Sequence, residues 1–174
     1  MKTLRLISTL MLVWAGLGRL MAFDNSGPRV EVKYFEPEHF TDVRDGYPEG
    51  TAKGRDAMLA DLKSYLVKRA VKFVGPGQKL TITITDVDLA GDFEPWRGPQ
   101  WDDIRVVKDI YPPAIELSFQ LKDADGNIVS SGKRTLRDLA FLMKLSIDNS
   151  DPLRHEKALL DDWLSTEFRA PKHA

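Results

Sequence analysis

The sequence predicts an α+β fold, a two-layer sandwich in which a mostly antiparallel sheet of about four strands carries helices on one face. Three observations point to this class. Apolar and polar residues alternate in four separate runs, as they do in half-buried strands. A long helical pattern lies between the first and second of these runs, and helical patterns return after the fourth. The expected order of elements is therefore β-α-β-β-β-α-α.

The first strand and the long helix are predicted by a change of period. Residues 30–34 alternate apolar and polar side chains, which indicates a half-buried strand. Residues 39–54 are polar and contain several glycines and a proline, and we expect a loop there. From Arg55 to Val74 apolar residues recur at helical spacing. The glycine–proline–glycine segment at 75–77 ends this helix because proline cannot continue it.

The second strand is expected to contain a bulge. Its apolar residues are even-numbered up to Ile84 and odd-numbered from Val87 onward. Side chains alternate between the two faces of a strand, so an unbroken strand would point Asp86 and Asp88 into the core. Burying unpaired carboxylates is costly, and a β-bulge near Thr85 avoids that cost.

The third and fourth strands are predicted to form a hairpin. Residues 115–122 alternate regularly, and the turn Asp123–Asn127 returns the chain into residues 128–135. The fourth strand is the more polar of the two, which is typical of a sheet edge. A short helical segment is predicted around residues 138–145. The last helix is expected to start with Asp151 as its N-cap and the following proline in its first position.

Composition excludes several classes of function. The chain has 174 residues, and its 25 Lys and Arg residues nearly balance 26 Asp and Glu residues, for a formal net charge of −1. Proteins that bind nucleic acid through phosphates normally have a basic excess, so we expect no nucleic-acid partner. The absence of cysteine excludes disulfides, thiolate metal sites and cysteine nucleophiles. No nucleotide-binding or hydrolase motif occurs and the three histidines lack metal-ligand spacing, so no cofactor or metal is expected.

The N-terminus is predicted to be a signal peptide, residues 1–22. Two basic residues precede an uncharged stretch from Leu6 to Leu17, and Ala22 fits the last residue before cleavage. The stretch is too short to span a bilayer, which takes about 20 apolar residues, so we expect no membrane span after cleavage. The mature chain, residues 23–174, is then a single α+β domain located in the periplasm or outside the cell.

The segment Gly91–Pro113 is the strongest candidate for a binding site. It is 23 residues long with weak periodicity, and long loops inside compact domains are often functional. Aromatic rings beside charged groups can stack on a sugar ring or hold a peptide. The alternative is that its two tryptophans fold back over the end of the sheet. The predicted contact residues are Trp96, Arg97, Trp101 and Arg105.

A second candidate is a group of carboxylates near the end of the second strand. Paired carboxylates can divide acid and base roles when their pKa values differ, or they can bind a hard cation. The alternative is that these acidic residues lie at a solvent-exposed strand end and have no chemical role. The residues in this group are Asp86, Asp88, Asp92 and Glu94.

Several segments of the chain carry motifs that occur together in one bacterial family. They are Val30–Asp42 (VEVKYFEPEHFTD), Thr83–Arg97 (TITDVDLAGDFEPWR), Asp103–Leu117 (DIRVVKDIYPPAIEL) and Asp151–Trp163 (DPLRHEKALLDDW). With these segments the chain resembles the exported family Domain of Unknown Function 3016 over nearly all of its mature length. His155 departs from the pattern, since an aromatic residue is expected there. The resemblance implies a small exported protein of a Gram-negative envelope, and no catalytic residue is carried over because the family has no assigned activity.

These observations favour an exported protein that binds a partner over an enzyme. We expect a non-enzymatic binding or accessory protein of the cell envelope. Its contact surface would be the segment Gly91–Pro113, and its partner an envelope protein or a glycan. One alternative is a hydrolase that acts on a cell-wall or sugar substrate through the clustered carboxylates. Another is a structural protein that self-associates through the polar fourth strand.

Overall fold

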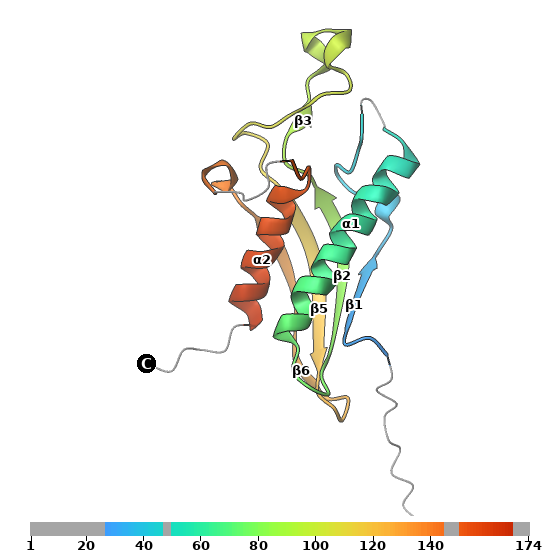
Figure 1. Cartoon of the computed structure of the whole chain (residues 1–174), viewed down its shortest axis with the longest axis vertical. Helices are drawn as coiled ribbons and strands as arrows, with labels where there is room; N and C mark the ends of the chain where they lie inside the picture. Colours follow the sequence, from blue (N-terminus) through green and yellow to red (C-terminus); the bar gives the residue numbers. More distant parts are fainter. Residues whose placement is uncertain (1–26, 47–49, 145–149, 169–174) are drawn as a thin grey trace, which may run out of the picture.

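In the computed structural model, which describes residues 27–46, 50–144 and 150–168, two helices cover one face of a four-stranded sheet (Figure 1). This arrangement confirms the predicted α+β class and the broad order of its elements. The principal elements are β1 (Val30–Tyr34), α1 (Ala52–Ala70), β2 (Lys79–Asp88), β5 (Ala114–Lys122), β6 (Ile128–Arg137) and α2 (Arg154–Phe168).

The strands of the sheet lie in the order β1-β2-β5-β6. β1 runs parallel to β2 because α1 connects them as a crossover, whereas the β2–β5 and β5–β6 pairs are antiparallel. β6 is an outer strand, as its polar sequence predicts. The register of β2 against β5 shifts between Ile84 and Asp86, which confirms the bulge. Beyond the bulge Val87 faces the core, so Asp86 and Asp88 face away from the helices.

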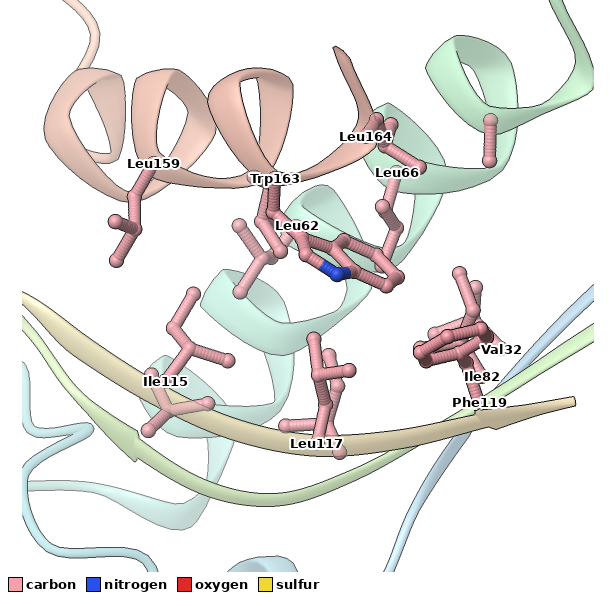
Figure 2. Close-up of a cluster of buried hydrophobic side chains, with 14 of the residues drawn as sticks. Val32, Leu62, Leu66, Ile82, Ile115, Leu117, Phe119, Leu159, Trp163 and Leu164 are labelled. Atoms are coloured by element: carbon pink, nitrogen blue, oxygen red, sulfur yellow. The ribbon is translucent and has the colours of Figure 1, made fainter. Parts of the chain in front are cut away.

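The hydrophobic core fills the space between the two helices and the sheet. Figure 2 shows leucines of α1 and the Trp163 side chain of α2 against the apolar face of the sheet. The rings of Phe119 and Trp163 meet edge to face, with their centroids 5.8 Å apart. Because both helices pack on this face, the opposite face presents polar side chains such as Glu116 and Ser118. Side chains with almost no exposed surface include Leu62, Leu66, Leu80, Ile82, Ile84, Ile115, Leu160 and Leu164.

The helix α1 starts earlier than its apolar pattern predicts. Its first residue is Ala52 rather than Arg55, because Thr51 caps the helix. The Thr51 hydroxyl accepts the N–H of Gly54 over 2.9 Å, and the Asp45 carboxylate in turn accepts the Thr51 N–H over 2.5 Å. These local hydrogen bonds extend the helix by one turn into a segment whose residues were expected to form a loop.

The elements after β6 are shorter than predicted. The helical segment expected around residues 138–145 contains one 3-10 turn, Phe141–Met143, and its last residue lies outside the described residues. The helix α2 starts at Arg154 rather than directly after Asp151. The Asp151 carboxylate nevertheless accepts the N–H of Leu153 over 2.8 Å, so it satisfies a free donor ahead of the helix as a capping residue does.

One end of the sheet gathers the segments that the sequence singles out. Asp88, Ala114 and Arg137 pair across β2, β5 and β6 at this end. The segment Gly91–Pro113 extends beyond it, and the turn Asp123–Asn127 lies at the opposite end (Figure 1). The candidate site is therefore built where β2 ends and β5 begins.

The N-terminal part of the chain stays a prediction. The signal peptide expected for residues 1–22 lies outside the described residues, and so does the start of the single domain expected for residues 23–174. Within the described ranges, no helix is both long enough and apolar enough to cross a membrane.

Candidate functional site

The segment Gly91–Pro113 forms a protruding hairpin rather than an irregular loop. Two short strands, β3 (Asp92–Phe93) and β4 (Arg105–Val106), pair at its base, and two 3-10 turns, Pro95–Arg97 and Pro99–Trp101, form its tip. Gly91 allows the two strands to meet, because its φ is +84° and a Cβ there would lie 2.8 Å from the carbonyl oxygen of Val106. Strands of two residues are too short to produce a visible alternation in the sequence.

A buried carboxylate, Asp42, ties the hairpin to the sheet. Its side chain is almost fully buried and lies beside the end of β2. Arg105 donates two hydrogen bonds to it, Nη1 to Oδ2 over 2.8 Å and Nη2 to Oδ1 over 3.1 Å, and Arg44 Nε donates a third to Oδ1 over 2.8 Å. Burial alone would raise the pKa of Asp42. The hydrogen bonds and charges of the two arginines outweigh burial and hold that pKa below its usual value.

The backbone of Asp42 extends the sheet edge at the same point. Its N–H donates to the carbonyl of Val87 over 3.0 Å, and its carbonyl accepts the N–H of Leu89 over 3.1 Å. Arg105 also donates to the carbonyl of Gly91 over 2.9 Å. The first residue of the hairpin, the end of β2 and the segment after β1 are therefore held by one set of hydrogen bonds.

The ring of Phe93 packs between the two arginines of this network. It is 3% exposed, and the guanidinium carbons of Arg105 and Arg44 lie 4.7 Å and 5.7 Å from its centroid. Arg44 also donates from Nη2 to Oδ1 of Asp92 over 3.3 Å. The base of the hairpin is thus rigid and its charges are compensated.

A second carboxylate, Glu94, organises the tip of the hairpin. It is 1% exposed and accepts a hydrogen bond from the Lys108 ammonium and one from the Tyr111 hydroxyl, the latter over 3.3 Å. Arg97 Nε lies 2.5 Å from its other oxygen. The hydrogen bond from Lys108 and the nearby positive charges hold the pKa of Glu94 below its usual value, against the opposing effect of burial. The Arg97 guanidinium carbon lies 5.1 Å from the centroid of a Trp101 ring.

Apolar side chains remain exposed at this end of the molecule. Trp96 is 70% exposed at the tip of the hairpin, although its neighbours Glu94 and Arg97 are paired with each other. Large apolar residues that share this exposure on the hairpin and on the segment after β6 are Ile104, Ile110, Leu139, Leu142 and Met143. Exposed apolar patches often mark interaction sites, which makes this end of the molecule a candidate contact surface.

A pocket of about 270 Å³ lies at the base of the hairpin. Its charged lining comes from the segment after β1, from the start of the hairpin and from the ends of β2 and β6. Burial raises the pKa of Asp88 in this pocket, and the carboxylates of Asp42 and Asp86 raise it further. The charged side chains that line the pocket are Asp42, Arg44, Asp88, Asp92 and Arg137, and the Tyr111 ring lines it as well.

The four predicted contact residues divide into two groups. Trp96, Arg97 and Trp101 lie at the tip of the hairpin, where Trp96 is open to solvent and Trp101 is partly covered. Arg105 lies at the base, where its guanidinium is used to hold Asp42. The tryptophans do not fold back over the sheet as a pair, because Trp96 projects into solvent.

The four predicted carboxylates have different surroundings. Asp86 accepts hydrogen bonds from the Thr41 N–H and hydroxyl, both over 2.7 Å. Asp92 pairs with Arg44, Glu94 is enclosed in the hairpin, and Asp88 lines the pocket. Among the residues that the structure describes, no group of three or more histidine, aspartate or glutamate side chains is arranged to hold a metal ion.

Sequence reasoning missed the part of the site that precedes α1. Asp42 and Arg44 lie in the segment predicted as a loop, and Arg137 was assigned to no site. One signal was present, since Asp42 and Arg44 flank Val43, which is 5% exposed, with the alternation of a strand. Their partner Arg105 lies 63 residues from Asp42 along the chain, so the pairing itself had no local signal.

His155 is half-buried at the start of α2. Its ring lies edge to face with Phe141, with centroids 4.8 Å apart. Burial lowers the pKa of His155, and the charge of Arg154 lowers it further. Its Nε2 atom is buried without a hydrogen-bond partner among the described residues.

The fold and the site together define an α+β protein with an ion-paired hairpin and a charged pocket at one end of its sheet. The chain belongs to the family described as Protein of unknown function (DUF3016), whose family model matches residues 28–166. The family resemblance read from the sequence is thereby confirmed. No curated protein matches the chain.

Two solved structures of PelC dodecamers from Paraburkholderia phytofirmans are similar to this chain. The first, a variant, is 13% identical, covers 84% of this chain and 89% of its own, and has a TM-score of 0.38. The second is 15% identical, covers 80% of this chain and 86% of its own, and has a TM-score of 0.36. At such low TM-scores neither likeness carries an argument about function.

Proposed function

We propose that this chain is an exported, non-enzymatic accessory protein of the bacterial envelope that binds a partner through the outer surface of its hairpin. The single observation that carries the proposal is the exposure of Trp96, 70%, next to a cluster in which Glu94 is paired with Arg97 and Lys108. A rigid, exposed tryptophan is a frequent energetic centre of protein interfaces.

The hairpin is suited to this task because it is preorganised. Its base is held through Asp42 and Arg105 and its tip through Glu94 and Lys108, so little conformational entropy remains to be lost on binding. Glu94 is paired with Arg97 and Lys108 inside the hairpin, whereas Trp96 is open to solvent. Ile104 is a second exposed apolar side chain of the hairpin, which favours a protein partner.

Export is supported by the composition of the chain. Residues 1–22 have the basic start, uncharged centre and small final residue of a signal peptide, and the chain has no cysteine to be oxidised outside the cytoplasm. The proposed location is the periplasm or the cell exterior.

Site-specific photo-crosslinking in cells that make the full chain tests the proposal. A photoreactive residue at Trp96 or at Ile104 is expected to give the same discrete protein adduct, because both side chains are exposed on the hairpin. Lys133, exposed on the outer strand β6, is the matched control position and should give no such adduct. Absence of an adduct from both hairpin positions, or an equal adduct from Lys133, contradicts the proposal.

A hydrolase acting on a cell-wall or sugar substrate remains the second candidate, and one observation favours it. Asp88 and Asp42 share a pocket, and their pKa values are moved in opposite directions. Asp42 is already held by two arginines, which leaves Asp88 as the acid. If the protein is a hydrolase, purified chain should release products from peptidoglycan or oligosaccharides, and Asp88→Asn should abolish that release. No product from the unchanged protein rejects this candidate.

A further inference from the structure

The pocket at the base of the hairpin contains two opposite charges that have no close partner. Asp88 and Arg137 both line it, yet neither side chain forms a hydrogen bond or an ion pair with any residue in the described ranges. The other charged groups of the pocket are engaged: Asp42 and Asp92 both accept hydrogen bonds from Arg44. One carboxyl group, of Asp88, and one guanidinium group, of Arg137, are therefore available to bind a ligand.

The sheet sets the spacing of these two groups. Asp88 on β2 pairs with Ala114 on β5, and Ala114 pairs with Arg137 on β6. Residues paired directly across strands point to the same face, so the Asp88 and Arg137 side chains rise from one face with a small alanine between them. Two strand spacings of roughly 4.8 Å place their Cα atoms about 10 Å apart. A carboxyl group and a guanidinium group thus lie on either side of a strand that carries only a small side chain at this level.

The two charged side chains determine which charges a ligand needs: a positive group beside Asp88 and a negative group beside Arg137. Asp42 and Asp86 add to the rise in the pKa of Asp88 that burial causes, whereas Arg137 and Arg105 lower it, and a cation placed beside Asp88 favours its charged form. On the other side of the pocket, the Arg137 guanidinium can donate two parallel hydrogen bonds to a carboxylate. A neutral ligand such as a sugar would cover both side chains without bringing an opposite charge to either.

We propose that this pocket binds a small zwitterion of the size of an amino acid or a dipeptide, with its ammonium group at Asp88 and its carboxylate at Arg137. The volume of about 270 Å³ suits a molecule of that size, and Leu89, Ile110 and Tyr111 provide apolar surface for its side chain. This site is separate from the outer surface of the hairpin. The proposal therefore stands or fails independently of the partner binding described above.

Titration of the full mature chain with small peptides tests the proposal. Leucylglycine carries both charges, its N-acetyl derivative lacks the cation, its amide lacks the anion, and glucose is a neutral control. Isothermal calorimetry or NMR shift mapping is expected to show saturable binding of leucylglycine. Removal of either charge should weaken binding at least tenfold, which corresponds to about 1.4 kcal/mol. Absence of saturation with leucylglycine and with free leucine up to about 10 mM, or equal binding of the acetylated peptide, overturns the proposal.

Matched variants locate the site. Asp88→Asn and Arg137→Gln should each reduce the affinity for leucylglycine by roughly tenfold or more. Glu116→Gln and Lys133→Gln change an exposed acid and an exposed base of the same sheet outside the pocket, and both should leave the affinity unchanged. Thermal melting of all four variants checks that they are folded. An equal loss of affinity in the control variants, or no loss in the two pocket variants, also overturns the proposal.

Discussion

Arg105 donates a hydrogen bond to each carboxylate oxygen of Asp42, with donor–acceptor distances of 2.8 and 3.1 Å. The two residues lie 63 positions apart in the sequence. The same guanidinium donates to the carbonyl of Gly91, where the hairpin leaves the sheet. The position of the hairpin therefore depends on one buried ion pair. This dependence makes the pair the most informative target for mutation.

Removal of Asp42 should destabilise the protein strongly. Asp42→Ala leaves two guanidinium groups without their shared acceptor, and we expect the free energy of unfolding to fall by about 3–5 kcal/mol. Arg105→Lys should lower the free energy of unfolding by less, because an ammonium keeps the positive charge but cannot form the bidentate pair of hydrogen bonds. Urea denaturation measures both changes. Glu116→Ala, a substitution at an exposed residue, is the control. A loss for Asp42→Ala as small as that of the control would mean that the network does not hold the hairpin.

Glu156 should make stability depend on pH. Its side chain is 1% exposed, Oε1 accepts the Ala90 N–H over 2.7 Å, and Oε2 has no hydrogen-bond partner among the described residues. Burial raises the pKa of Glu156 above its usual value, against the lowering effects of the Ala90 N–H and of nearby arginines. Between the unfolded pKa, about 4.3, and the raised folded pKa, the folded state binds more protons than the unfolded state. Stability from this group is therefore complete at low pH and is lost as the pH rises through that window.

The variant Glu156→Gln tests this dependence, because glutamine does not ionise and keeps an acceptor for Ala90. We expect its unfolding free energy to exceed that of the unchanged protein increasingly as the pH rises from about 4 to 8. Glu116→Gln, the same substitution at an exposed residue, is the control. Parallel stability curves for Glu156→Gln and the unchanged protein would show that Glu156 does not titrate differently on folding.

The two hairpin tryptophans should differ in their effect on stability. Trp96→Ala removes an exposed side chain and should change the unfolding free energy by no more than about 0.5 kcal/mol. Trp101→Ala removes the ring that Arg97 covers, and should cost about 1 kcal/mol. We expect both variants to weaken recovery of a crosslinked partner, measured with the photoreactive residue at Ile104. Undiminished recovery in Trp96→Ala would exclude that side chain from the contact surface.

Export predicts a defined mature chain. Cleavage after Ala22 yields a protein that begins at Phe23, which intact-mass measurement of the extracytoplasmic fraction detects. Leu12→Arg places a charge in the uncharged stretch and should retain the precursor inside the cell, whereas Leu12→Val should be processed normally. Recovery of a full-length chain in the cytoplasm from the unchanged gene would contradict the prediction.

Local patterns account for most of the secondary structure, and they do so for identifiable reasons. The change of parity between Ile84 and Val87 located the bulge in β2, because side chains alternate strictly along a strand. The polar composition of β6 placed it at the edge of the sheet. Predictions were less accurate where side-chain hydrogen bonds move a boundary, as Thr51 does at the start of α1.

The candidate site was predictable only in part. Trp96 and Arg97 were found because aromatic and charged residues cluster in a long segment without periodicity. Asp88 was included in the acidic group, but the structure places it in the pocket, whereas Asp86 binds Thr41 and Glu94 is enclosed in the hairpin. The roles of these residues in binding stay predictions.

By itself the sequence determined the α+β class, the bulge, the polar edge and the family, because each of these depends on residues close together in the chain or on motifs read in order. Only the tertiary structure decided that Asp42 meets Arg105 and that Asp88 lies across Ala114 from Arg137. Contacts of this kind depend on the order of the strands in the sheet and on how closely the hairpin approaches the segment after β1. Many chain paths satisfy the same local pattern, and the packing of the core selects one of them.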